Sequence, residues 1–237
     1  DYRRYRSQVY YGPRPDGHRY IHRTEYHANL EVVTDLRNQL LERALNLTVF
    51  SAQFHSQDNL GVEVDPTYVM LDRPFNIAPG ITMPAGAEYR FTRVALRGQT
   101  ANRRVLALNG RFETGGFYSG HRNQTILGLT VRARPGYIFS LNGEWNDVDL
   151  AEGSFTSNVF RGVADTQFSP FMAIVNIIQY DTMSRVLGWQ SRYRWILKPG
   201  NDLYVVYTHN WVEDPIRDRF GTLDRRAASK VLYTQRF

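Results

Sequence analysis

The chain has 237 residues, enough for one large or two small domains, and 42% of them are hydrophobic. It contains no cysteine, which excludes disulfide scaffolds, thiolate metal sites and cysteine nucleophiles. The formal charge is +6, but the arginines are spread singly along the chain and form no basic cluster, which argues against a nucleic-acid-binding protein. Asp1 opens a polar, arginine-rich stretch without the pattern of a signal peptide, so we expect a mature chain or a fragment.

Runs with the period-two alternation of β-strands recur along the whole length. The segment 35–47, which overlaps the run 39–56, is ambiguous, because Leu36, Leu40, Ala44 and Leu47 could also form one face of an amphipathic helix. The strand-like residues that follow it and the strands on both sides favour one long strand. We expect thirteen strands, at residues 2–11, 18–33, 39–56, 60–71, 89–99, 103–117, 123–133, 137–147, 156–167, 171–182, 187–197, 203–213 and 226–237.

The expected connections alternate between two kinds. Alternation of short turns with longer loops is typical of an up-and-down membrane barrel, whereas a Greek-key sandwich mixes its loop lengths. The short kind comprises 12–17, 56–59, 100–102, 134–136, 168–170 and 198–201. The other kind comprises 72–88, 119–123, 147–154 and 213–224, together with two short members at 34–38 and 182–185.

Most of these runs have one apolar and one polar side. Alternation alone does not distinguish a strand that packs on a protein core from one that faces lipid. The length of the runs favours strands that face lipid. Runs of about ten residues or more match the 9–11 residues of a tilted membrane-spanning strand better than the 5–6 residues of an average strand in a globular protein. In the hairpin 191–211 we expect 198–201 to be a periplasmic turn. We expect Arg192 and Arg194 to face a lumen, and Tyr193, Trp195, Leu203, Val205 and Tyr207 to face lipid.

Tryptophans lie near strand ends on the apolar side. We expect Trp145, Trp189 and Trp211 at the long-loop end and Trp195 with Tyr137 at the short-turn end, as two interfacial belts. Ordinary core tryptophans are the alternative interpretation.

The chain closes on KVLYTQRF. A final strand ending in Phe237, with Tyr233 and Val231 on the same face, resembles the C-terminal signal that the assembly machinery of bacterial outer-membrane barrels recognises, although Gln235 departs from the alternation. If Phe237 ends in the periplasm, an upward strand should precede the first strand of this chain. Thirteen is also odd, and single-chain bacterial barrels usually have even strand numbers. We therefore expect further strands upstream of Asp1.

Five segments carry a closer resemblance: LDRPFNIAPGITMPAG, FETGGFYSGHRN, NDVDLAEGSFTSN, SRYRWILKPGNDLYVVYTHNW and LDRRAASKVLYTQRF. From roughly Thr34 onward the chain resembles the C-terminal β-barrel of a bacterial outer-membrane family that is described as a domain of unknown function. That domain commonly follows a module resembling a family 9 carbohydrate-binding domain, which is absent from this sequence. The resemblance implies architecture and location and supplies no catalytic residues.

Three groups of side chains are candidates for a metal site or a catalytic site. His18 and His22 lie four residues apart, with His27 on the other face; on a strand that spacing is about 13 Å, too far to chelate one ion. The oxygen-rich loop with Asp147, Asp149 and Glu152 could bind calcium but lacks the EF-hand spacing.

Glu113 and Glu144 could form an acid–base pair in a lumen. The same side is expected to hold Arg93, Arg97, Arg111, Arg132, Arg192 and Arg194, so ladders of salt bridges are the stronger expectation.

The sequence therefore predicts an all-β fold: an antiparallel up-and-down transmembrane β-barrel over residues 1–237, the C-terminal portion of a larger barrel in the bacterial outer membrane. We expect a non-enzymatic membrane anchor, scaffold or pore with no catalytic, cofactor-binding or metal-binding residues. Its expected partners are the lipid bilayer, the barrel-assembly machinery and a larger membrane complex, and no nucleic acid. A transport channel for anionic or carbohydrate-type solutes and the membrane anchor of a carbohydrate-active protein are the alternatives, and a soluble β-rich protein remains a third interpretation.

Overall fold

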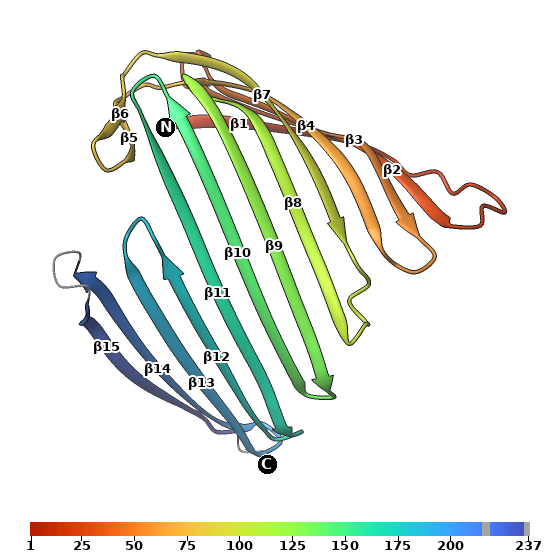
Figure 1. Ribbon diagram of the computed structural model, residues 1–237, viewed down its shortest axis with the longest axis vertical. Helices are drawn as coiled ribbons and strands as arrows, with labels where there is room; N and C mark the ends of the chain where they lie inside the picture. Colours follow the sequence, from red (N-terminus) through yellow and green to blue (C-terminus); the bar gives the residue numbers. More distant parts are fainter. Residues whose placement is uncertain (215–218, 235–237) are drawn as a thin grey trace. The chain divides into compact units, whose positions relative to one another are not determined.

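The computed structural model describes residues 1–214 and 219–234. The regular secondary structure of these residues consists of β-strands, without helices. Thirteen strands form one sheet in the order β1-β2-β3-β4-β7-β8-β9-β10-β11-β12-β13-β14-β15, and β5 and β6 form a separate two-stranded sheet (Figure 1). The strands are β1 Tyr2–Tyr11, β2 Ile21–Asp35, β3 Leu40–Phe54, β4 Asn59–Met70, β5 Phe75–Ala78, β6 Ile81–Met83, β7 Glu88–Gln99, β8 Leu106–Phe117, β9 Gly120–Arg134, β10 Tyr137–Leu150, β11 Gly153–Ser169, β12 Met172–Asp181, β13 Val186–Lys198, β14 Asn201–Asp214 and β15 Arg219–Leu232.

The predicted all-β fold and the thirteen strands of the large sheet are confirmed. The ambiguous run 39–56 is strand β3, which pairs along its length with β2 and β4. Two ladders of backbone hydrogen bonds outweigh a weak local helix preference, because propensity is only a small term beside tertiary pairing. The short strands β5 and β6, inside the connection from β4 to β7, were not expected.

The predicted difference in loop length is largely wrong. Among the expected long loops that lie wholly within the described residues, only the connection 71–87 has that length; β8–β9 and β10–β11 turn over two residues each, 118–119 and 151–152. Strand β15 begins at Arg219, seven residues before its expected start, and the terminal residue Phe237 lies outside the described residues. The polar residues at these strand ends still pair through their backbones, which do not depend on side-chain polarity.

Two of the predicted turns have the backbone that their sequence demands. The pairs Pro135-Gly136 and Pro199-Gly200 are the whole connections of β9–β10 and β13–β14. Gly136 has φ 81° and Gly200 φ 88°, the left-handed conformation that a Pro-Gly turn requires at its second central residue.

The sheet has two free ends. Strands β1 and β15 end the strand order, and within the described residues no pairing joins them, so closure into a barrel is not present in this structure. The chain divides into two compact units. Unit 1 comprises 1–102, 109–126 and 145–156, and unit 2 comprises 103–108, 127–144 and 157–237.

Candidate functional site

Charged side chains gather on one face of β4, β7 and β8 in unit 1. The register places Glu63 opposite Ala95 and Asp65 opposite Arg93. On the next pair of strands, Ala95 lies opposite Glu113 and Arg97 opposite Arg111. Because side chains alternate between the two faces of a strand, all these residues project from the same side, which we call the charged face.

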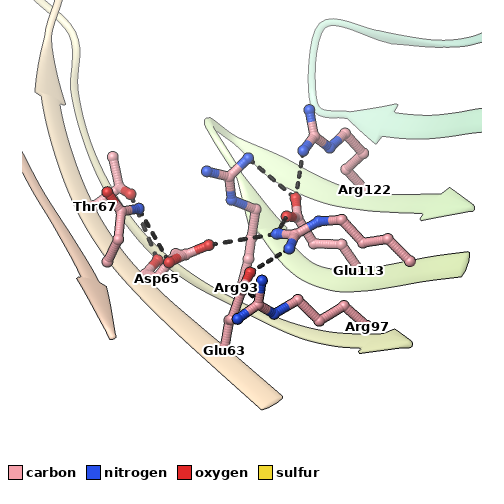
Figure 2. Close-up of polar contacts among 9 residues, drawn as sticks. Glu63, Asp65, Thr67, Arg93, Arg97, Glu113 and Arg122 are labelled. Atoms are coloured by element: carbon pink, nitrogen blue, oxygen red, sulfur yellow. Dashed lines mark hydrogen bonds and ion pairs between the residues drawn. The ribbon is translucent and has the colours of Figure 1, made fainter. Parts of the chain in front are cut away.

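These residues form one connected ladder of ion pairs, the charge ladder (Figure 2). Arg97 Nε lies 2.9 Å from Glu63 Oε1, and Arg111 bridges Glu63 to Glu113, with 2.7 Å between Arg111 Nη2 and Glu113 Oε2. Arg93 Nη1 is 3.2 Å from Glu113 Oε1. Arg122, at the start of β9, also pairs with Glu113, so three guanidinium groups converge on this one carboxylate.

The ladder reaches β3 through two further contacts, and a separate group of ion pairs joins β1 and β2. Arg111 Nη2 lies 3.8 Å from Asp65 Oδ2, and the Asn46 side chain donates a hydrogen bond of 3.0 Å to Asp65 Oδ1. On β2, Glu31 pairs with Arg4 at 3.0 Å and with Arg6 at 2.7 Å. Polar residues of the charged face are thus paired between β1 and β2 and, as a separate group, from β3 to β9.

Burial on the two faces is the reverse of that in a soluble sheet protein. On the charged face, Glu113 is only 4% exposed and Asp65 7%. On the opposite side of β7 and β8, the apolar face, Val94 is 45% exposed, Leu96 51%, Leu108 50% and Phe112 47%. These four large hydrophobic side chains point to the surroundings, while the carboxylates of Glu113 and Asp65 are enclosed.

The charge ladder carries a net positive charge. It contains Arg93, Arg97, Arg111 and Arg122 against Glu63, Asp65 and Glu113, so four guanidinium groups meet three carboxylates. Each of the three carboxylates contacts at least one guanidinium group. The arrangement can attract an anion or hold strands in register, and it lacks the free carboxylate that acid–base catalysis needs.

The hairpin β5–β6 is connected to the charged face through an aromatic cluster at the β8–β9 turn. The ring of Phe75, on β5, lies 6.0 Å from the ring of Tyr118, measured between centroids. The Tyr118 ring lies 5.8 Å from that of Phe91, which projects from the charged face. Burial raises the pKa of the Tyr118 phenol, which lies in the turn between β8 and β9, above its ordinary value. Backbone hydrogen bonds between Leu71 and both Gly86 and Ala87 close the base of this segment.

Apolar contacts hold the tip of the hairpin in place. Met83 is fully buried and Ile81 nearly so, as are Val148 and Leu150 at the end of β10. A side chain added at Gly153, at the start of β11, would meet the Ile81 Cδ1 atom at 3.1 Å. The hairpin therefore has a small hydrophobic core of its own against the ends of β10 and β11.

In unit 2 the hairpin β13–β14 sorts its side chains as predicted. Tyr193 lies opposite Val205 and Trp195 opposite Leu203, so the apolar residues share a face. On the other face Arg194 pairs with Asp202 at 3.0 Å. Trp189 contacts Tyr207 at 5.6 Å on the apolar face. Trp189, Trp195 and Trp211 are thus on one side of this hairpin, while their contact with lipid stays a prediction.

The other candidate residues are placed as follows. His18 Nδ1 accepts the backbone N–H of Ile21 at 2.9 Å, and the ring of His22 contacts that of His55 at 5.5 Å. Glu152 accepts a hydrogen bond from Ser119. Within residues 1–214 and 219–234, no group of three or more His, Asp or Glu side chains could hold a metal ion.

The predicted salt bridges on the charged face are present for Arg93, Arg97, Arg111 and Glu113. Glu144 and Arg132 belong to unit 2, outside the charge ladder. Sequence reasoning missed Glu63, Asp65 and Arg122. The first two occupy alternate positions of the run 60–71, so its period of two already carried the signal.

No protein-family model matches the chain, and no curated protein matches it either. The described residues include no helix that is long and apolar enough to cross a membrane.

Proposed function

We propose that the chain is a membrane-spanning β-sheet of the bacterial outer membrane, part of a larger barrel that acts as a non-enzymatic anchor, scaffold or pore. The observation that carries this proposal is the reversed burial of its two faces. A large exposed apolar surface is costly in water and favourable in lipid, where an apolar exterior around a polar interior is the rule for barrels.

The strand lengths support the same reading. Strands of the large sheet have between 10 residues, in β1 and β12, and 17 residues, in β11. A tilted strand needs about 9–11 residues to cross the hydrocarbon region, so every strand of this sheet is long enough.

The free ends of the sheet determine what a complete barrel requires. Strands joined by two-residue turns run antiparallel, and the sheet keeps its strands in chain order, so β1 and β15 run in the same direction. Direct pairing of β1 with β15 would be parallel. An unpaired edge is not tolerated in lipid. An all-antiparallel closure therefore needs an odd number of further strands, which we assign to polypeptide outside this sequence and which the assembly machinery would join.

Flotation with lipid vesicles tests this proposal. After refolding in the presence of vesicles, together with the polypeptide that supplies the remaining strands, the chain should float with them through a density gradient and resist extraction by high salt and alkali, as an integral protein does. A chain that stays at the bottom of the gradient as a folded, monodisperse protein without detergent would contradict the proposal and favour a soluble β-protein.

A second candidate function, passage of anionic solutes, is favoured by the positive excess of the charge ladder. Bilayers that contain the closed barrel should show anion-selective reversal potentials under a salt gradient. Replacing the half-exposed Arg97 by Gln should reduce that selectivity. An unchanged reversal potential in the variant would contradict a selectivity role for the charge ladder.

A further inference from the structure

The apolar face of unit 1 has charges at one end only. On strands β3, β4, β7 and β8, which lie wholly within the described residues, the apolar face carries three charged side chains, Arg43, Glu88 and Arg90. Arg43 lies three residues after the start of β3, and Glu88 and Arg90 lie at the start of β7. These positions are at the same end of the sheet, because β3 and β7 flank β4 and run parallel to each other.

The two arginines flank a groove on this face. Tyr68 of β4 lies opposite Arg43 on one side and opposite Arg90 on the other. The Tyr68 side chain is only 8% exposed, and the Arg90 guanidinium carbon lies 5.4 Å from its ring centre. The groove has a volume of about 560 Å³ and is lined by Leu30, Arg43, Leu45, Pro66, Thr67, Tyr68, Arg90, Phe91 and Thr92.

The guanidinium groups of the groove are free to take a ligand. On these four strands Glu88 is the only carboxylate of this face, and it lies two positions before Arg90 on β7. Among the residues that the structure describes, neither Arg43 nor Arg90 has an ion-pair partner within 4.0 Å, and both side chains are exposed. This distinguishes them from the arginines of the charge ladder, which all have carboxylate partners.

The depth of the two arginines fits the headgroup region of a bilayer. With about 3.3 Å per residue and a tilt of about 40°, the 12 residues of β7 extend roughly 28 Å along the membrane normal, against an apolar band about 25 Å tall. Arg90 then lies roughly 5 Å from the end of its strand, close to the edge of the band. The 15 residues of β3 extend roughly 35 Å, which brings Arg43, roughly 8 Å from its end, to a similar level.

We propose that the groove between Arg43 and Arg90 binds an anionic phospholipid of the bilayer, with the phosphate between the two guanidinium groups and an acyl chain along Leu30, Leu45 and Pro66. The inference rests on the proposed membrane function. Charge complementarity selects the ligand: two unpaired guanidinium groups match an anionic phosphate, and the apolar groove below them matches a hydrocarbon chain. A free anion would leave the apolar part of the groove unused.

Native mass spectrometry of the purified chain tests the site. The chain is released from micelles that contain equal amounts of phosphatidic acid and phosphatidylcholine, and the ratio of the two retained lipids is measured. The wild type should retain phosphatidic acid in preference, and the double variant Arg43→Gln, Arg90→Gln should retain the two lipids in the supplied ratio. The variant Arg43→Lys, Arg90→Lys should keep part of the preference, because lysine retains the charge but not the bidentate geometry.

A matched control removes the same charge elsewhere. Arg14 and Arg103 are exposed in the connections at the other end of the strands, and replacing both by Gln should leave the wild-type preference unchanged. Circular dichroism of each variant establishes that its strands have formed. A wild-type lipid ratio in the Arg43→Gln, Arg90→Gln variant would overturn the proposal.

Two further outcomes separate this inference from the proposed function. If the wild type floats with vesicles but retains both lipids equally, the lipid site is wrong and the membrane function stands. If it floats with vesicles of neither lipid, the membrane function itself is wrong. Inorganic phosphate that competes as strongly as phosphatidic acid would show a site for the free ion and would also overturn the assignment to a lipid.

Discussion

Replacing Val94 by arginine tests whether the apolar face meets lipid or water. Val94 lies at the middle of β7, on the apolar face, and its side chain is 45% exposed. In water a substitution at an exposed strand position changes the free energy of unfolding by about 0.5 kcal/mol or less. At the centre of a bilayer an outward-facing arginine costs about 2–4 kcal/mol. The two environments therefore give clearly different results.

The matched control is Val105→Arg. Val105 lies in the connection before β8 and is 68% exposed, so the same change of side chain is made at a strand end instead of mid-strand. Near the interface the cost of arginine falls to about 0–1 kcal/mol. The unfolding free energy of each variant is measured by denaturant titration of the chain folded in lipid vesicles.

We expect the Val94→Arg variant to lose about 2–4 kcal/mol relative to wild type, which is about 30- to 700-fold in the folding equilibrium constant. The Val105→Arg variant should remain within about 1 kcal/mol of wild type. Equal small effects in both variants would refute the argument that the exposed apolar residues face lipid.

Two other predictions concern packing within unit 1. Replacing Glu113 by Ala should cost about 3 kcal/mol, the lower end of the range for breaking a buried ion pair, because its arginine partners are partly exposed. The same change at Glu31, whose partners are more exposed, should cost less than about 1 kcal/mol; equal losses in denaturant titrations would argue against burial as the cause. Gly120→Ala should destabilise by more than about 1 kcal/mol, since its Cβ would lie 1.9 Å from the carbonyl oxygen of Asp149. Gly221→Ala, with nothing within 4 Å, should be nearly neutral, and a thermal midpoint equal for the two alanine variants would contradict the close approach at Gly120.

Local pattern was sufficient for most of the fold. The alternation of apolar and polar residues predicts the strands at 123–133 and 187–197. The Pro-Gly pairs predict turns, because glycine readily adopts the positive φ that such turns require. The predictions of the strand ends and of the long loops were wrong. Residues such as Asp147 and Asp149 look like a polar loop in sequence, yet β10 continues to Leu150. A strand extends as far as the neighbouring strand supplies backbone hydrogen-bond partners. The length of the neighbouring strand cannot be derived from the sequence of the first strand alone.

The charge ladder shows the same division. Arginines at 93, 97 and 111 alternate with apolar residues, which was enough to place them on one face and to expect ion pairs. Which carboxylates they meet depended on register, because a shift of one residue would move Glu63 and Asp65 to the opposite face. The convergence of Arg93, Arg111 and Arg122 on Glu113 brings together residues from three strands, and no spacing along the chain encodes it.

By itself the sequence determined the class of structure: an all-β chain of thirteen long strands with one apolar and one polar side, because the period of two is a local property of the extended backbone. Only the tertiary structure decided which side is enclosed. Burial depends on what lies across from a side chain, and here the charged residues are enclosed and the apolar ones exposed. It also decided that Phe75 of the connection 71–87 contacts Tyr118 of the β8–β9 turn and that Arg43 and Arg90 flank one groove, since both arrangements join residues far apart along the chain.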